Sequence, residues 1–285
     1  MAGTKRERDE RDPDAMDESS DEDFDMVNVD FEWFNFDPEV DFHGTKTLLR
    51  QLLDVDAPLF DVSSLADLIL SQPTVGSTVK TDGKESDAYA LITALSLRTH
   101  ASHAALSGLA AYISQKTGAG AIAEALSSGG SADVGLVLSE RLINMPSEVA
   151  GPMYSMLVDE LDAAVEDKEP YAFSHFLVLS RVYREVAPDP DVATDQRPKN
   201  KKAREAAGSS GEGETLYFHP EDEVLARFAA AKGSYKYTKE DEAVADSKRA
   251  FSEMGIRTEG YVMLIEAAKF REAVQAVGRY LGSGA

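Results

Sequence analysis

The sequence contains no cysteine, so disulfide bonds and thiolate metal sites are excluded. It has no apolar run near the roughly 18 residues that a membrane-spanning helix needs, and no signal-peptide pattern opens it. Positive charge is also scarce: 29 Lys and Arg stand against 51 Asp and Glu in 285 residues, a net charge of −22. We therefore expect a soluble, intracellular and strongly acidic protein.

This negative charge restricts the classes of partner. It repels nucleic acid and anionic membranes, and it attracts basic proteins. An acidic composition is equally typical of a protein that is merely very soluble, and composition alone leaves both interpretations open. We expect no direct binding of nucleic acid or membrane, no cofactor, and a monomer.

Residues 1–25 are dense in charge and almost free of apolar side chains, which predicts a disordered acidic tail. The tail contains the kind of site that acidophilic kinases prefer, although such sites are common in acidic tails. Its two acceptors and the acidic residues that follow them are Ser19, Ser20, Asp21, Glu22 and Asp23.

The hydrophobic pattern of the remaining chain predicts alternating strands and helices. Period-two alternation marks a half-buried first strand, and apolar residues at helical spacing mark the helices. We expect strands at residues 27–33, 75–80, 88–97, 172–186 and 261–265, and helices at 41–54, 63–72 and 101–126. A final helix carries one apolar face, which consists of Phe270, Val274, Val277 and Leu281.

The centre of the predicted domain is a buried strand followed by an amphipathic helix. The strand begins at Val134, is rich in branched residues, and ends before Pro146. Pro152 lies near the first position of the helix, where its missing N–H costs nothing. One face of this helix is apolar and the other acidic. The acidic face is a candidate partner-binding surface, although an ordinary solvated helix face looks the same in sequence. It contains Asp159, Glu160, Asp162 and Glu166.

A basic segment interrupts the predicted domain. Residues 188–213 hold prolines, glycines, serines and almost no apolar side chain, which predicts a disordered loop. Because residues 214–285 look too small to fold alone, we expect a single domain over residues 26–285. The loop contains a short basic pattern that is typical of a nuclear localisation signal. Solvated charge on a loop is the alternative interpretation. The basic residues of the pattern are Lys201, Lys202 and Arg204.

One motif favours an enzyme. Residues 115–121 fit the Q/R-x-x-G-x-G/A pattern with which acetyltransferases bind the pyrophosphate of coenzyme A. That chemistry needs backbone N–H groups on a loop directly between a strand and a helix. Here the motif follows a helical stretch, so glycines that end a helix are the ordinary explanation. An acyl-coenzyme A-dependent acetyltransferase acting on a basic protein stays the alternative function.

Other catalytic or metal-binding patterns are weak. His100 and His103 could share one helical face, but no carboxylate or cysteine signature accompanies them. No Gly-x-Ser-x-Gly elbow indicates a hydrolase. We therefore name no catalytic, cofactor or metal residues.

Several segments together resemble the BCCIP family. They are residues 27–32, 41–49, 135–146, 152–154 and 262–265, with the basic insertion in the expected place. The likeness runs from about residue 27 to the C-terminus, and residues 135–146 are its most specific part. The acidic tail is similar in composition alone.

The resemblance implies a fold similar to that of the GCN5-related acetyltransferases, with a largely antiparallel sheet and helices on both faces, without that activity. It also implies a nuclear chaperone, shuttling to the cytoplasm, that protects a basic protein of the large ribosomal subunit, universal large-subunit protein fourteen. Family members are tied to nuclear export of a phosphoinositide kinase, which implies contacts with nuclear transport receptors. Animal members are tied to DNA repair and cell-cycle control.

Overall fold

The computed structural model describes residues 30–118, 120–127, 132–185, 215–240 and 256–282. The described residues from Phe31 onward belong to one compact unit. The predicted acidic tail and basic loop lie outside the described residues, as do Ser19, Ser20, Lys201, Lys202 and Arg204.

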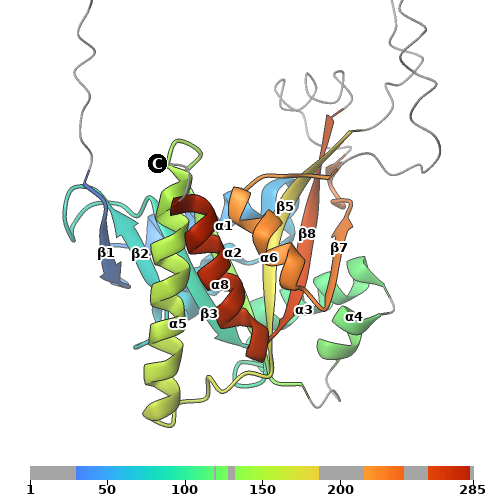
Figure 1. Ribbon diagram of the computed structural model, residues 1–285, viewed down its shortest axis with the longest axis horizontal. Coiled ribbons are helices and arrows are strands. Elements are labelled where there is room, and N and C mark those ends of the chain that lie inside the picture. Colours follow the sequence, from blue (N-terminus) through green and yellow to red (C-terminus); the bar gives the residue numbers. More distant parts are fainter. Residues whose placement is uncertain (1–29, 119, 128–131, 186–214, 241–255, 283–285) are drawn as a thin grey trace, which may run out of the picture. The chain divides into compact units, whose positions relative to one another are not determined.

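The unit is built on one mixed, mostly antiparallel sheet of eight strands (Figure 1). Between β4 and β5 the pairing is parallel, and every other pairing in the described part of the chain is antiparallel. The strand order is β1 (Glu32–Asn35), β2 (Ser77–Lys80), β3 (Ala90–Ser96), β4 (Val134–Arg141), β5 (His175–Glu185), β8 (Ile256–Glu266) and β7 (Ala231–Tyr235), with β6 (Thr215–Tyr217) paired to β5.

Helices cover both faces of this sheet, which confirms the predicted α/β class. One face packs against α5 (Ala150–Glu166), α6 (Pro220–Phe228) and α8 (Ala267–Gly282), which Figure 1 shows over the near side of the sheet. The opposite face packs against α1 (Phe42–Leu53), the 3-10 helix η1 (Asp54–Leu59), α2 (Val62–Leu70), α3 (Ala104–Thr117) and α4 (Ala121–Ala125). No helix among the described residues is long and apolar enough to span a membrane.

Strand β4 is buried on both faces, as its run of branched residues predicts. Leu136 and Leu138 belong to the α1–α4 core, whereas Val137 belongs to the core under α5. Successive side chains of a strand point to opposite faces, so such a run fits a sheet covered on both sides. A short 3-10 helix, η2 (Ser147–Val149), then leads from Pro146 into α5.

The structure corrects several predicted boundaries. The helical stretch expected at residues 101–126 begins at Ala104 and consists of α3 and α4, because Gly118 ends α3 with a positive φ of 70°. The last strand is longer than predicted and spans Ile256–Glu266. The first strand is observed at Glu32–Asn35, and residues 27–29 lie outside the described part.

Besides η1, three elements were not predicted at all: β6, α6 and β7. Strand β7 reads Ala-Lys-Gly-Ser-Tyr, which lacks the branched residues that indicate a strand. It forms because β8 supplies a long edge with which it can pair. These elements join the sheet of the N-terminal half, so residues 215–282 belong to the same fold.

Candidate functional site

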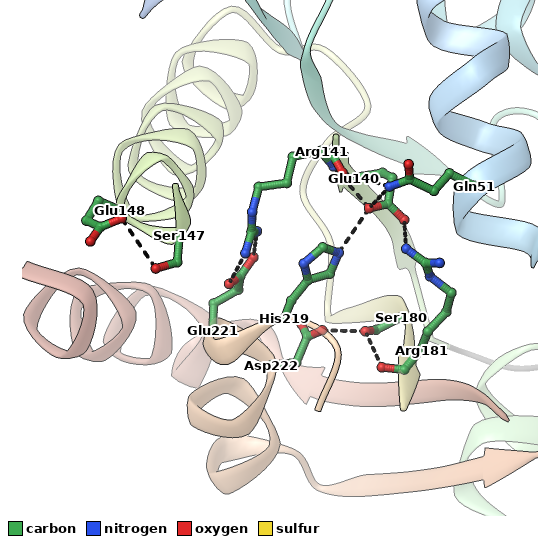
Figure 2. A network of polar contacts seen from close by, with 10 residues as sticks. All are labelled: Gln51, Glu140, Arg141, Ser147, Glu148, Ser180, Arg181, His219, Glu221 and Asp222. Atoms are coloured by element: carbon green, nitrogen blue, oxygen red, sulfur yellow. Dashed lines mark hydrogen bonds and ion pairs between the residues drawn. The ribbon is translucent and has the colours of Figure 1, made fainter. Parts of the chain in front are cut away.

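The sheet forks at the C-terminal end of β4. Strand β4 pairs with β5 as far as Leu138 and Leu179 and ends at Arg141, while β5 continues to Glu185. Because β8 pairs with the whole length of β5, β6 occupies the side of β5 that β4 has left, opposite Val182–Arg184. Polar side chains fill this fork. We call them the fork network: Gln51, Glu140, Arg141, Ser180, Arg181, His219, Glu221 and Asp222 (Figure 2).

Glu140 is the centre of the network on the α1 side. One carboxylate oxygen lies 2.7 Å from Nη2 of Arg181, and the other lies 3.0 Å from Nε2 of His219 and 2.9 Å from Nε2 of Gln51. Burial raises the pKa of Glu140, but the hydrogen bond to His219 and the charge of Arg181 outweigh it and hold that pKa below its ordinary value. A single buried carboxylate therefore joins α1, β4, β5 and the start of α6.

The α6 side of the network carries two further carboxyl groups, those of Glu221 and Asp222. The guanidinium of Arg141 bonds both oxygens of Glu221, with Nη2 at 3.1 Å from Oε2. The hydroxyl of Ser180 donates to Asp222. Burial, together with the neighbouring charge of Glu221, raises the pKa of Asp222 to about 7, although the charge of His219 acts in the opposite direction.

The network has the geometry of a structural lock rather than of a catalytic centre. The hydroxyl of Ser180 donates to Asp222, so the Ser–His pair of a nucleophilic hydrolase is not formed here. The guanidinium of Arg181 stacks 3.9 Å from the ring centroid of Phe218. The charged residues of the fork network are buried, and none of them is more than 7 % exposed. We conclude that the network fixes the start of α6 to β4 and β5 of the sheet.

The two described glycines of the motif at residues 115–121 lie between the helices α3 and α4. Gly118 ends α3 and Gly120 precedes α4, a helix of five residues. A pyrophosphate cradle of the predicted kind needs a loop that leaves a strand and enters a helix. The ordinary explanation, glycines at a helix end, fits this position, and the structure does not supply the strand.

No group of three or more His, Asp or Glu side chains in the described ranges is placed to hold a metal ion. His103 instead precedes α3, and its Nε2 lies 3.4 Å from the hydroxyl oxygen of Ser64 on α2.

The acidic residues predicted on α5 divide into two kinds. Asp159, Asp162 and Glu166 are exposed, and Asp162 forms an ion pair with Arg271 of α8. Glu160 is mostly buried: it accepts a hydrogen bond of 2.7 Å from the amide of Gly76 and another from the hydroxyl of Ser77. Burial raises the pKa of Glu160 despite these bonds. Its carboxylate joins α5 to β2, whereas the other three face solvent. Asp21, Glu22 and Asp23 lie outside the described residues.

A model of the BCCIP family matches residues 26–225. "Protein BCP1" of Gibberella zeae is 58% identical over 293 residues, which cover 99% of this chain and 99% of the relative. This chain belongs to the BCCIP family. The family member from Schizosaccharomyces pombe, "Protein bcp1", is 39% identical and covers 95% of this chain and 96% of its own length.

A solved structure supports the fold of this BCCIP member. The crystal structure of BCP1 from Saccharomyces cerevisiae aligns with a TM-score of 0.59 at 25% identity, and the alignment covers 94% of this chain and 98% of that one. None of these relatives bears the name of an enzyme, which is consistent with a non-enzymatic family role.

Sequence reasoning missed the fork network, although two signals could have found it. Glu140 and Arg141 end an otherwise apolar strand, and charges next to a buried run usually find partners. The second signal is the helix start at residues 219–223, where Pro220 and three acidic residues open α6.

Proposed function

We propose that this BCCIP member is a non-enzymatic nuclear escort. It binds a newly made basic protein of the large ribosomal subunit, universal large-subunit protein fourteen, and releases it to the pre-ribosome. The same escort activity then gives the protein a role in nuclear export and in ribosome biogenesis. The observation that carries the proposal is a row of exposed carboxylates along α5 and at its C-terminal cap, on a chain with a net charge of −22. Asp159 and Glu166 lie in the helix, and Asp167 is the capping residue that follows it.

The physical argument rests on competition between polyanions. Ribosomal proteins carry dense Lys and Arg on surfaces that later contact RNA, and these surfaces bind the wrong nucleic acid before assembly. An acidic protein surface steers their association and covers them. Exposed carboxylates are individually weak and screened by salt, so ribosomal RNA can displace them.

We further infer a fold similar to that of the GCN5-related acetyltransferases in which catalysis is idle. The mixed sheet with helices on both faces supports the likeness. The position of the glycine motif between α3 and α4 argues against the alternative, an acetyltransferase acting on a basic protein. An enzyme would bind its substrate transiently and show turnover, whereas an escort forms a stable complex.

Reversing the exposed charges of α5 is expected to weaken the complex. The variant Asp159→Lys, Glu166→Lys, Asp167→Lys should lose about 10- to 100-fold in affinity at low salt, because each exposed charge pair contributes about 0.2–1 kcal/mol and reversal adds repulsion. Calorimetry at two salt concentrations measures the loss, which should shrink as salt rises.

A matched control carries the same change of net charge elsewhere. Asp67, Glu85 and Glu124 are exposed and lie away from α5, on α2, the β2–β3 turn and α4. Their replacement by Lys should weaken binding far less. Equal losses in both triple variants would mean that net charge alone, and not the α5 row, attracts the partner.

Location in the nucleus is proposed from the basic segment. Replacing Lys201, Lys202 and Arg204 by Ala should leave the protein in the cytoplasm, because a short basic cluster is what import receptors recognise. Fluorescence microscopy of a tagged chain measures this. A variant that stays nuclear would show that another signal or a bound partner carries it in. We also propose that the protein contacts nuclear transport receptors and a phosphoinositide kinase. A further part of the proposal is phosphorylation of the acidic tail at Ser19 and Ser20.

A further inference from the structure

One carboxylate holds the segment that follows β7 against the rest of the fold. Asp56 of η1 accepts hydrogen bonds of 2.7 Å from the backbone amides of both Thr238 and Lys239. It also accepts one from the hydroxyl of Tyr112 on α3. The side chain of Thr238 acts with these donors to lower the pKa of Asp56. We call Asp56, Tyr112, Thr238 and Lys239 the Asp56 clasp.

The clasp is built around a buried negative charge. Asp56 is 1 % exposed. Burial raises its pKa, but the hydrogen bonds from Thr238, Tyr112 and Lys239 outweigh burial and hold the pKa below its ordinary value. Asp56 is therefore ionised at neutral pH and depends on its donors for stability. A second negative charge at this place would compete with it directly.

Neighbouring contacts reinforce the clasp. Nζ of Lys116 lies 2.7 Å from the carbonyl oxygen of Lys236 and over the ring of Tyr112. On the other side of Thr238, Glu240 forms an ion pair of 2.6 Å with Arg257 of β8. The segment is thus tied to α3, η1 and β8, and its opening needs these polar contacts to part together.

Thr238 itself is exposed and lies outside helix and strand. In the sequence it is followed by Lys239 and then by three acidic residues, Glu240, Asp241 and Glu242. Kinases that select acidic substrates recognise carboxylates a few positions after the acceptor. We propose that Thr238 is a phosphorylation site for a kinase of this class and that its phosphate opens the Asp56 clasp.

The step is an ordinary phosphoryl transfer from ATP. The hydroxyl oxygen of Thr238 forms a bond to the γ-phosphorus, the bond from that phosphorus to the β,γ-bridging oxygen breaks, and ADP leaves. The hydroxyl proton passes to the base of the kinase. The product carries close to two negative charges and three acceptor oxygens where the native residue has a neutral hydroxyl.

Two effects compete after the transfer, and geometry decides between them. Lys116 and Lys236 both keep their charge and attract the phosphate, but Nζ of Lys116 is held at the carbonyl oxygen of Lys236, and Lys236 is exposed, so that solvent screens its charge. Asp56 is in direct hydrogen-bond contact with the backbone amide of Thr238, at 2.7 Å. Repulsion at contact distance therefore prevails, and the residues after β7 part from η1. This modification does not depend on the identity of the escorted protein.

The test uses the full chain, ATP and an acidophilic kinase whose activity is confirmed on a standard acidic peptide. Mass spectrometry should find phosphate on Thr238, and the Thr238→Ala variant should lack it. Hydrogen exchange should then show the amides of Thr238 and Lys239 at least about tenfold less protected in the phosphorylated protein. Absence of phosphate at Thr238, or unchanged or greater protection of these amides, would overturn the proposal.

A second variant tests the role of the clasp. Asp56→Asn keeps the shape but weakens the acceptor, so Thr238 should be phosphorylated several-fold faster. Tyr112→Phe removes one of the donors to Asp56, so it should also raise the rate of phosphorylation, but by less. This variant replaces Asp56→Asn in the test if Asp56→Asn does not fold. A rate that is unchanged or slower in the folded variants contradicts a clasp that restrains the backbone at Thr238.

Discussion

Replacing Glu140 by Ala is expected to lower the free energy of unfolding by about 3–5 kcal/mol, because it leaves the buried charge of Arg181 without its partner. The same change removes the acceptor of His219 and of Gln51. Chemical denaturation followed by circular dichroism measures this loss, with the slope of the transition compared between variants.

The matched control is Glu223→Ala on the exposed surface of α6. Glu223 also pairs with an arginine, Arg227 at 2.6 Å, but both side chains face solvent. Its loss should be about 0.5 kcal/mol or less. If Glu140→Ala costs no more than this control, the fork network does not stabilise the fold, and its role as a lock is wrong.

The buried Asp222 should make stability fall as the pH rises from about 4 to about 7. In the unfolded chain an Asp has a pKa of about 3.9, whereas burial raises the pKa of Asp222 in the fold to about 7. Between these values the unfolded chain has lost the proton that the native protein keeps. Stability therefore declines by about 1.4 kcal/mol per pH unit at most, some 2–4 kcal/mol in all, and is level above the folded pKa.

The variant Asp222→Asn isolates this effect. The amide cannot ionise, and its oxygen can still accept the hydrogen bond from Ser180. Subtracting the stability of the variant from that of the unmodified protein at each pH removes other titrating groups, among them Glu160, whose pKa is also raised. The difference should decline across this pH window. A flat difference would show that Asp222 is ionised in the fold from low pH.

Local sequence patterns predicted most of the N-terminal half and the central unit. In β4, branched apolar residues on both faces indicate a strand under two layers of helices, and that is where the structure places it. In α5, Pro152 and an apolar stripe at helical spacing predicted the helix, which begins two residues earlier. Such elements are specified by residues within them.

The fork was not predictable in this way because its parts are distant in sequence. Glu140 meets His219 only when β5, β6 and the start of α6 are in place, and β6 has three residues. No periodicity can be detected over three residues. The same limit applies to Glu160: helical spacing assigns it to the polar side of α5, but not to the part of that side that meets Gly76 and Ser77.

The candidate partner surface could be predicted as a helix face, but not residue by residue. Asp159, Asp162 and Glu166 are exposed as expected, but Asp162 forms an ion pair with Arg271. Exposure depends on which neighbouring element reaches the helix, and α8 is more than a hundred positions away in the sequence. The row formed by Asp159, Glu166 and Asp167 is therefore a product of the fold.

The central claim is that this BCCIP member holds a basic ribosomal protein in a stable complex and yields it to RNA. Sedimentation velocity of the purified chain with universal large-subunit protein fourteen tests it most directly, first alone and then with a ribosomal RNA fragment that binds that protein. We expect a one-to-one complex at low salt, weakened by salt, from which the RNA takes the ribosomal protein and leaves this chain free. No complex at low salt, or a ternary complex that keeps this chain on the RNA, would contradict the account.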